Sequence, residues 1–227
     1  EDTKARSRLD GFLSFVAEFE LEQSPVVNDE KSRQAFYLNA YNACSLRGGL
    51  EFHTQGKIPD EFDTNLIFTV AGQEMSLHQM AEQTAVQTDW RISLALSRPA
   101  LSGPYLSNQV YSVVQLENQL DQAMKDYLGS CAGCQIDFAK QQVLLGGLIY
   151  DRKEEFLQEY KRRYGIEGES LVSALIPYAW PATQVQMAEA AGFAVGRLPS
   201  DNRINDIERE DLQEDDSQEE YRICGCQ

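Results

Sequence analysis

The chain has 227 residues, of which 42% are hydrophobic and 10% aromatic, so it can form a buried core and is not expected to be disordered. Its 36 acidic residues exceed its 20 Lys and Arg, and the formal net charge of −16 disfavours binding to nucleic acid or to anionic lipid. No apolar run approaches the roughly 20 residues of a membrane span, so an integral membrane protein is not expected, although attachment to a membrane complex stays open.

The spacing of apolar residues predicts the secondary structure in chain order. The expected elements are helices at 6–21 and 29–46, strands at 65–70 and 73–76 joined by a turn at Ala71 and Gly72, a helix at 76–86, a strand at 91–97, a helix from Ser112 onward, strands at 135–138 and 142–145, and helices at 151–164, 170–178 and 184–191. Gly48 and Gly49 are expected to end the second helix, and Ser76 is expected to cap the third. Residues 91–97 are almost continuously apolar, which is typical of a buried central strand.

The order of these elements contains no internal repeat and no clear linker. It therefore predicts a single helix-rich α+β domain around a small, mainly antiparallel sheet, followed by an acidic C-terminal tail. In that tail, the segment Asp206–Glu220 holds nine acidic residues against one base, Arg209. Such a run predicts either a solvated tail or an arm that docks on a basic partner protein. It lacks the glycine and the spacing of a calcium-binding loop.

Five cysteines leave three interpretations open. Cys44 is single within the second helix, whereas Cys131 and Cys134 form a C-x-x-C pair and Cys224 and Cys226 form a C-x-C pair. The two pairs are compatible with disulfides, with a tetrahedral zinc site, or with unpaired thiols. We favour disulfides, because both pairs lie on glycine-containing segments that suit a staple between tail and body. Together with a first residue other than Met, this predicts a processed protein in an extracytoplasmic compartment or an organelle lumen.

Motifs that mark enzymes are scarce in this sequence. It has no phosphate-binding glycine loop, no G-x-S-x-G elbow and no H-E-x-x-H pair. Its histidines are His53 and His78, and a dyad of Cys44 with His78 would require a reactive thiolate. Cys44 lies among apolar neighbours, where a buried and inert thiol is expected.

Residues 35–43, Ala-Phe-Tyr-Leu-Asn-Ala-Tyr-Asn-Ala, resemble the A-F-W-I-N-x-Y-N-A signature of the family catalogued as domain of unknown function 547. Three further stretches follow in the order of that family. Residues 70–77 resemble its v-x-G-x-x-x-S-L stretch, residues 89–96 its D-P-R-I-H-F-A-L stretch, and residues 198–206 its L-P-Y-D-W-x-L-N-D stretch. The resemblance implies a family domain over residues 5–206, followed by the acidic, cysteine-ended tail over 207–227.

The chain departs from this family where members commonly carry reactive side chains. Ser93 stands at a histidine position, and Gly103 stands at a cysteine position. Met80, Ala81 and Glu82 replace an I-E-H triplet. Serine is no base near neutral pH and glycine is no nucleophile, so the resemblance implies a pseudoenzyme that keeps the fold without the reaction and needs no cofactor.

The polar residues that still match the family are expected to act mainly as scaffolding. Asn39 and Asn42 lie three apart on one helix face, where their amides can satisfy buried backbone groups of a neighbouring segment. Arg91 and Asp201 are candidates for an ion pair between the central strand and the C-terminal segment. A vestigial ligand pocket is expected from six residues: Asn39, Asn42, Arg91, Ser93, Gly103 and Asp201.

The sequence thus predicts a non-catalytic accessory or structural subunit, or binding protein, of a larger assembly. Other protein subunits are the expected partners, with the acidic tail Asp206–Glu220 as one contact. Two alternatives stay open. The first is an enzyme of the cysteine hydrolase or transpeptidase kind that uses Cys44, and the second is a small-ligand-binding protein that uses the vestigial pocket.

Overall fold

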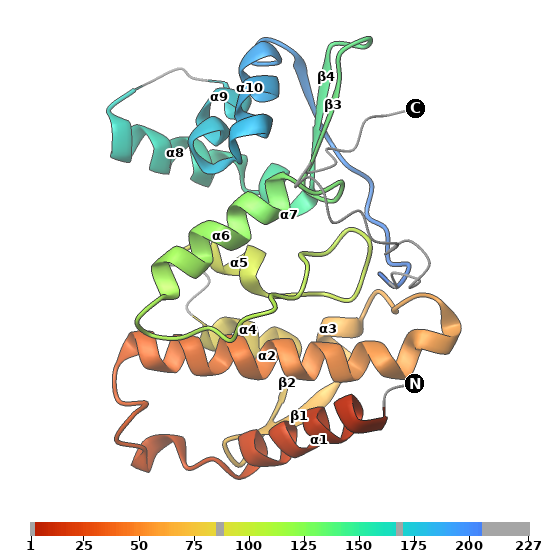
Figure 1. Ribbon diagram of the computed structural model, residues 1–227, viewed down its shortest axis with the longest axis vertical. Coiled ribbons are helices and arrows are strands. Elements are labelled where there is room, and N and C mark those ends of the chain that lie inside the picture. The colour runs from red at the N-terminus through yellow and green to blue at the C-terminus, as the bar shows by residue number, and fades with distance from the viewer. Residues whose placement is uncertain (1–2, 85–88, 167–169, 206–227) are drawn as a thin grey trace, which may run out of the picture. The chain divides into compact units, whose positions relative to one another are not determined.

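The computed structural model describes residues 3–84, 89–166 and 170–205, and it divides the chain into two compact units (Figure 1). Within the described residues, unit 1 holds the chain up to Ala123 together with Asn202–Ile204. Unit 2 holds Met124–Asp201 together with Asn205. The sequence predicts a single domain. In the structure, unit 1 includes Asn202–Ile204, which come after Met124–Asp201 of unit 2 in the chain.

The helix-rich α+β class predicted from the sequence is confirmed. The helices are α1 (Thr3–Glu18), α2 (Glu30–Phe52), α3 (Phe62–Asn65), α4 (Leu77–Gln83), α5 (Ile92–Ala95), α6 (Leu116–Leu128), α7 (Gly147–Tyr150), α8 (Lys153–Tyr164), α9 (Leu171–Leu175) and α10 (Pro181–Glu189), and the strands are β1 (Ile67–Val70), β2 (Gln73–Ser76), β3 (Cys134–Asp137), β4 (Gln142–Leu145) and β5 (Ala194–Arg197). Among the residues that the structure describes, no helix is both long and apolar enough to cross a membrane.

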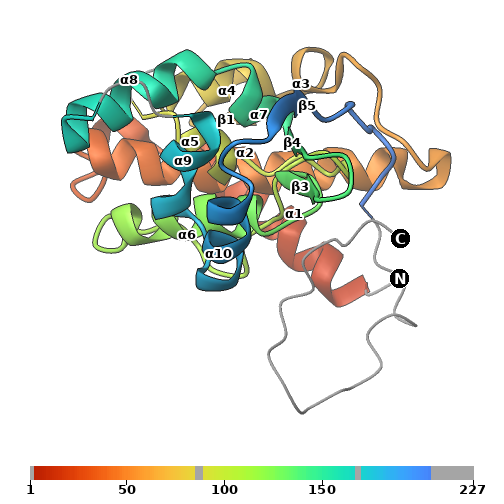
Figure 2. The ribbon, with the colours of Figure 1, turned by 90° about the horizontal axis from the view of Figure 1, so that it is seen from above.

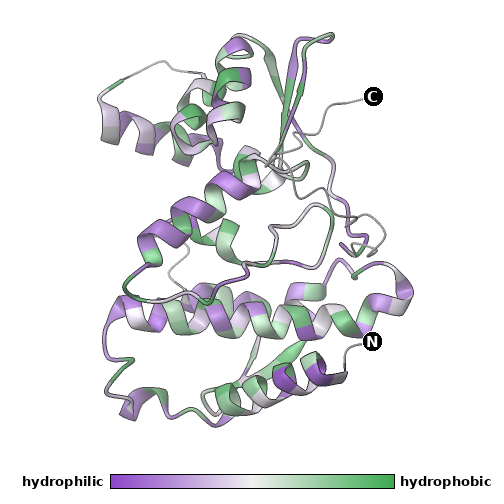
Figure 3. Cartoon of the chain, viewed as in Figure 1, coloured by the Kyte–Doolittle hydropathy of each residue, from purple (hydrophilic) through white to green (hydrophobic). Residues whose placement is uncertain are grey.

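Helix α1 packs along α2 and the β1–β2 hairpin, and it crosses α2 obliquely (Figure 2). Hydrophobic positions recur along α1 (Figure 3), and Val16 is its fully buried residue. The last turn of a helix leaves carbonyl groups without partners inside the helix. Here the hairpin turn supplies those partners, because the backbone N–H of Ala71 donates to Val16 O at 2.9 Å and that of Gly72 donates to Ala17 O at 2.8 Å.

The β1–β2 hairpin follows the sequence prediction closely. The strands pair antiparallel, with Val70 opposite Gln73. Ala71 and Gly72 both adopt positive φ, the conformation that a tight two-residue turn requires for twisted strands. The predicted cap is confirmed as well, since the Ser76 hydroxyl accepts from the Gln79 N–H and the Gln79 side chain accepts from the Ser76 N–H.

Helix α2 starts where the sequence predicts but does not end at the two glycines. The Asp29 carboxylate accepts from the Ser32 N–H at 2.7 Å and caps the helix, which continues through Gly48 and Gly49 to Phe52. A Cβ atom on Gly48 would lie 2.6 Å from Leu66 Cδ1, and one on Gly49 would lie 2.8 Å from Pro99. The glycines therefore serve close packing, which outweighs their low helix propensity.

The central strand predicted over residues 91–97 is wrong, because this segment forms the single-turn helix α5. Its hydrogen bonds are local: the Asp89 carboxylate accepts from the Arg91 N–H at 3.0 Å, and the Ser93 hydroxyl donates to Trp90 O at 2.6 Å. Such side-chain bonds favour a turn over an extended strand. The apolar run reflects burial alone, since Ile92 and Leu94 are fully enclosed.

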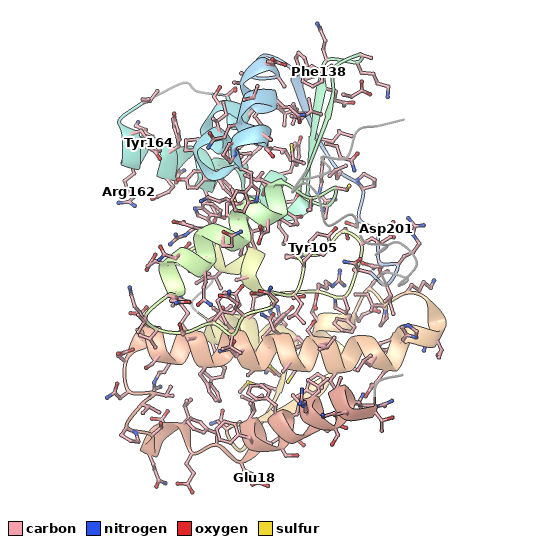
Figure 4. The ribbon with its side chains drawn as sticks, viewed as in Figure 1. Glu18, Tyr105, Phe138, Arg162, Tyr164 and Asp201 are labelled. Carbon is pink, nitrogen blue, oxygen red and sulfur yellow. The ribbon has the colours of Figure 1, made fainter. Side chains whose placement is uncertain are left out.

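Unit 2 contains a mixed three-stranded sheet and its own helices. Strands β3 and β4 form the predicted antiparallel hairpin, with Phe138 near its tip (Figure 4), and the sheet also includes the unpredicted β5, parallel to β4.

Helix α6 begins at Leu116, four residues after the predicted start. Its buried face carries the apolar residues Leu116, Leu120, Met124 and Tyr127.

Candidate functional site

Two asparagines of α2 hold the loop that joins α5 to α6. Asn39 Nδ2 donates to Tyr111 O at 2.8 Å, and Asn39 Oδ1 accepts from the Tyr111 N–H at 2.8 Å. Asn42 Nδ2 donates to Ala95 O at 3.0 Å, and Asn42 Oδ1 accepts from the Ser97 N–H at 2.8 Å. A primary amide offers a donor and an acceptor side by side, which suits this two-point contact with a backbone. The predicted contact of both amides with backbone groups of a neighbouring segment is confirmed.

A cavity of about 240 Å³ opens between α1, α2 and this loop. Its lining contains no charged side chain. The lining residues are Leu9, Phe12, Asn39, Asn42, Ala43, Leu46, Leu106, Ser107, Asn108, Gln109, Val110 and Tyr111. Of the six residues expected to form a vestigial pocket, Asn39 and Asn42 line this cavity, and the other four do not.

Ser93 and Gly103 lie elsewhere in unit 1. The Ser93 hydroxyl is half-buried and donates to Trp90 O. Gly103 is buried, and a Cβ atom there would lie 2.5 Å from the carbonyl oxygen of Arg98. A cysteine at position 103 would thus require a shift of the backbone.

Arg91 forms a cluster of ion pairs that the sequence analysis did not predict. Its guanidinium lies within 2.5 to 2.8 Å of carboxylate oxygens of Asp89, Glu117 and Asp121, and the Arg91 side chain is 16% exposed. Asp201 belongs to unit 2, so the expected pair between Arg91 and Asp201 stays a prediction. The cluster connects the segment before α5 with α6 inside unit 1.

Sequence reasoning missed a polar network that holds Asn202 in unit 1. Arg98 Nε lies 3.3 Å from Asp63 Oδ2, Arg98 Nη1 donates to Asn202 Oδ1 at 3.1 Å, and Asn202 Nδ2 donates to Asp60 Oδ1 at 2.7 Å. Burial raises the pKa of the Asp63 carboxyl, and the charge of Arg98 opposes that shift. The signal was available in part, because Asn202 belongs to the terminal stretch that resembles the family.

The described thiols are not poised for nucleophilic attack. Cys44 is fully buried and Cys134 is 6% exposed, and both are free. Burial raises the pKa of each thiol to about 12, so the thiolate is scarce near neutral pH. The free state of Cys134 does not support a disulfide at that position. Cys131 is half-buried, and Cys224 and Cys226 lie outside the described residues.

The residues of α4 do not complete a dyad or a metal site. His78 is exposed, and its Nε2 lies 3.8 Å from a carboxylate oxygen of Glu82. Met80 is fully buried and Ala81 half-buried, so neither presents a reactive group. Within residues 3–84, 89–166 and 170–205, no cluster of three or more His, Cys, Asp or Glu side chains is arranged to hold a metal ion.

The comparisons with known proteins agree with the resemblance seen in the sequence. Residues 27–128 match the model of the family described as "Protein of unknown function, DUF547". No curated protein matches the chain, and no solved structure matches it. The matched segment runs from just before α2 to the end of α6, and it includes Asn39, Asn42, Ser93 and Gly103. The chain is therefore similar to the DUF547 family over residues 27–128.

Proposed function

We propose that this protein is a non-catalytic binding subunit of a larger protein assembly. The observation that carries the proposal is an exposed apolar surface on the loop between α5 and α6. Residues from Pro99 to Leu116 include no charged side chain, although 25% of the whole chain is charged. We call the exposed apolar side chains of this stretch the apolar loop surface. They are Leu101 (38% exposed), Tyr105 (50%), Leu106 (45%), Val110 (74%), Val113 (41%) and Val114 (94%).

An uncharged, apolar and partly aromatic patch has the composition of an interface centre. Interface centres are depleted of charge and enriched in aromatic residues. Complete burial of one valine side chain contributes roughly 1.5–3 kcal/mol. Val110 and Val114 are mostly exposed, so a partner that covers both gains a substantial driving force. Tyr105, labelled in Figure 4, lies on the same loop.

The chemistry of unit 1 favours binding over catalysis. The Ser93 hydroxyl is engaged with Trp90 O, and position 103 has no room for a side chain on the present backbone. The buried Cys44 thiol holds its proton near neutral pH. These features support a fold that persists as a scaffold for the loop.

Measurement of the native mass tests whether the protein is part of an assembly. The protein is purified gently from its source and its migration compared with the mass of the single chain, 25.6 kDa. Migration in a large complex supports the proposal, and migration near 25.6 kDa refutes it. The double variant Val110→Asp, Val114→Asp should leave the complex. The control Val185→Asp, at a 60% exposed valine of α10, should remain in it. Retention of the double variant would contradict the role of the apolar loop surface.

The tail extends this proposal. We propose that the acidic segment Asp206–Glu220 contacts a basic region of the partner and that a disulfide tethers the tail. Cys44 and Cys134 are free, so the tether would join Cys131 to one of the two tail cysteines, in an extracytoplasmic or lumenal compartment. Peptide mapping without reduction should recover a peptide of Cys131 linked to a tail peptide. Recovery of Cys131 as an alkylated thiol would exclude the tether.

A further inference from the structure

We infer that Asn202–Ile204 form a detachable strap that holds the α5–α6 loop in its binding conformation and so controls binding of the partner. We call this segment the C-terminal strap. The inference rests on the proposed function, because it concerns the regulation of the apolar loop surface. It goes beyond that proposal by assigning control of the surface to a segment that follows most of unit 2 in the chain.

One edge of the strap pairs with the segment before α3. The Ile58 N–H donates to Asn202 O at 2.9 Å. The Ile204 N–H donates to Gly56 O, also at 2.9 Å. The Ile204 side chain is half-buried and packs against the hydrophobic core of unit 1. These contacts dock the strap on a part of unit 1 that is separate from the loop.

The other edge of the strap bonds the loop. The Leu101 N–H donates to Arg203 O at 2.9 Å. In an extended backbone the carbonyl groups of neighbouring residues point to opposite sides, so the strap can bond two segments at once. Asn42 and Asn39 hold the two ends of the loop, and Leu101 lies between those ends. The strap therefore adds a fixed point within the loop.

The Asn202 side chain joins the same two segments. Its Nδ2 donates to Asp60 Oδ1 at 2.7 Å, and its Oδ1 accepts from Arg98 Nη1 at 3.1 Å. Arg98 lies at the start of the loop, and its Nε is 3.3 Å from Asp63 Oδ2. A single amide thus links the segment before α3, the strap and the loop. Loss of this amide is expected to loosen both edges of the strap together.

The strap can detach while unit 1 stays folded. The hydrophobic core of unit 1 consists of buried residues between Val16 and Leu120, all of which precede the strap in the chain. The strap itself is short and half-buried to exposed, and water can replace its hydrogen bonds when it lifts away. Contacts of this kind open locally at a lower free energy than the core.

Detachment changes the affinity of the loop for a partner. A loop with an additional fixed point loses less conformational entropy on association than one held at its ends alone. Coupling between two binding events is reciprocal. A partner bound at the apolar loop surface therefore stabilises the docked strap by the same factor by which the docked strap strengthens binding.

Amide hydrogen exchange on the full chain tests the link between strap and loop. Asn202→Ala removes both side-chain hydrogen bonds of the strap, and the control Asn28→Ala makes the same change at an exposed residue just before α2. We expect Asn202→Ala to speed exchange of the Leu101 amide about tenfold, as the loss of two hydrogen bonds implies. Exchange of the Gly103 and Tyr111 amides should also become faster. Asn28→Ala should change none of these rates.

The spread of the faster exchange decides between a strap and a local contact. Faster exchange at Leu101 alone would overturn the inference, because the strap would then not set the path of the loop. Unchanged exchange at Leu101 would also overturn it, if Ile204→Pro, which removes the N–H bonded to Gly56 O, gives the same result. The Ala71 and Gly72 amides, which bond the end of α1, should keep their rates after Asn202→Ala. Faster exchange there would mean that the strap opens only when unit 1 unfolds.

Native mass then tests the control of binding. If the wild-type protein migrates in a complex, we expect Asn202→Ala to dissociate from it at higher protein concentration than the wild type, while Asn28→Ala behaves as the wild type. A loosened loop in an Asn202→Ala protein that binds with wild-type strength would overturn the inference and leave the subunit proposal standing. If the wild-type protein migrates alone, the subunit proposal fails and control of binding fails with it. The exchange rates then still decide whether the strap sets the loop.

Discussion

Replacement of Asn42 by alanine tests the scaffold beneath the apolar loop surface. The Asn42 amide holds Ala95 O and the Ser97 N–H in surroundings that are buried, and both backbone residues are less than 9% exposed. Alanine leaves these two groups without a partner, and each buried unsatisfied group costs about 1–3 kcal/mol. The better helix propensity of alanine offsets about 0.6 kcal/mol. We expect Asn42→Ala to lower the free energy of unfolding by about 1.5–5.5 kcal/mol.

Asn39→Ala is the matched comparison, because Asn39 makes the same pair of bonds on the same helix. Its bonds to Tyr111 lie in half-buried surroundings, where water can replace the amide. We expect a loss of about 1 kcal/mol, the typical net contribution of a replaceable hydrogen bond.

Urea unfolding followed by tryptophan fluorescence measures both losses. The chain has two tryptophans, Trp90 in unit 1 and Trp180 in unit 2. A Trp180→Phe background makes the signal report unit 1. The midpoint should fall while the slope with denaturant stays constant. A loss below about 1 kcal/mol for Asn42→Ala, or a loss no larger than that of Asn39→Ala, would refute the assignment of burial-dependent roles.

Four further outcomes follow from the described contacts. Cys44 should resist alkylation by iodoacetamide at pH 8 in the folded protein, because a thiol with a pKa of about 12 is a thiolate in roughly one molecule in ten thousand. Rapid labelling of Cys44 would instead favour the alternative of an enzyme that uses this cysteine. Tyr127→Phe should leave the free energy of unfolding unchanged or raise it by up to about 1 kcal/mol, because the buried Tyr127 hydroxyl has no hydrogen-bond partner within the described chain. A clear loss of stability in thermal unfolding would show that the hydroxyl has a partner. Hydrogen bonds from Arg197 lower the pKa of Asp151. This exposed ion pair therefore stabilises the folded protein at pH values above the ordinary carboxyl pKa, and the stabilisation is lost as the pH falls through the lowered pKa. Asp151→Asn should lower the free energy of unfolding by less than about 1 kcal/mol at pH 7 and should have no effect in strong acid. Truncation after Asp201 should destabilise unit 1 in urea, and truncation after Asn205 should not; equal midpoints would contradict the role of Asn202–Ile204.

Local signals in the sequence were reliable where the structure is determined by neighbours in the chain. The spacing of Asn39 and Asn42 fixed their shared face of α2, and the Ala71–Gly72 turn fixed the first hairpin. Residues 91–97 misled because a short apolar run is shared by buried strands and buried helical turns. Here the Asp89 carboxylate and the Ser93 hydroxyl decide in favour of the turn.

Long-range packing explains the features that no local pattern could predict. Gly48 and Gly49 predict the end of a helix, but in the structure their lack of a side chain allows Leu66 and Pro99 to approach α2. Strand β5 pairs in parallel with β4 across a long stretch of chain, and its sequence has no run of β-branched residues. The cavity depends on the path of the loop, so its lining is absent from the sequence pattern apart from Asn39 and Asn42.

Residues from the stretches that resemble the family converge on one loop. Asn42 holds the start of the α5–α6 loop, and Asn39 holds Tyr111 near its end. Between them, the Leu101 N–H donates at 2.9 Å to the carbonyl oxygen of Arg203, a residue of the terminal stretch that resembles the family. Holding the loop in this way has a physical reason if the loop itself binds. A loop fixed at three points loses little conformational entropy on association, so its apolar surface can contribute most of its burial to affinity.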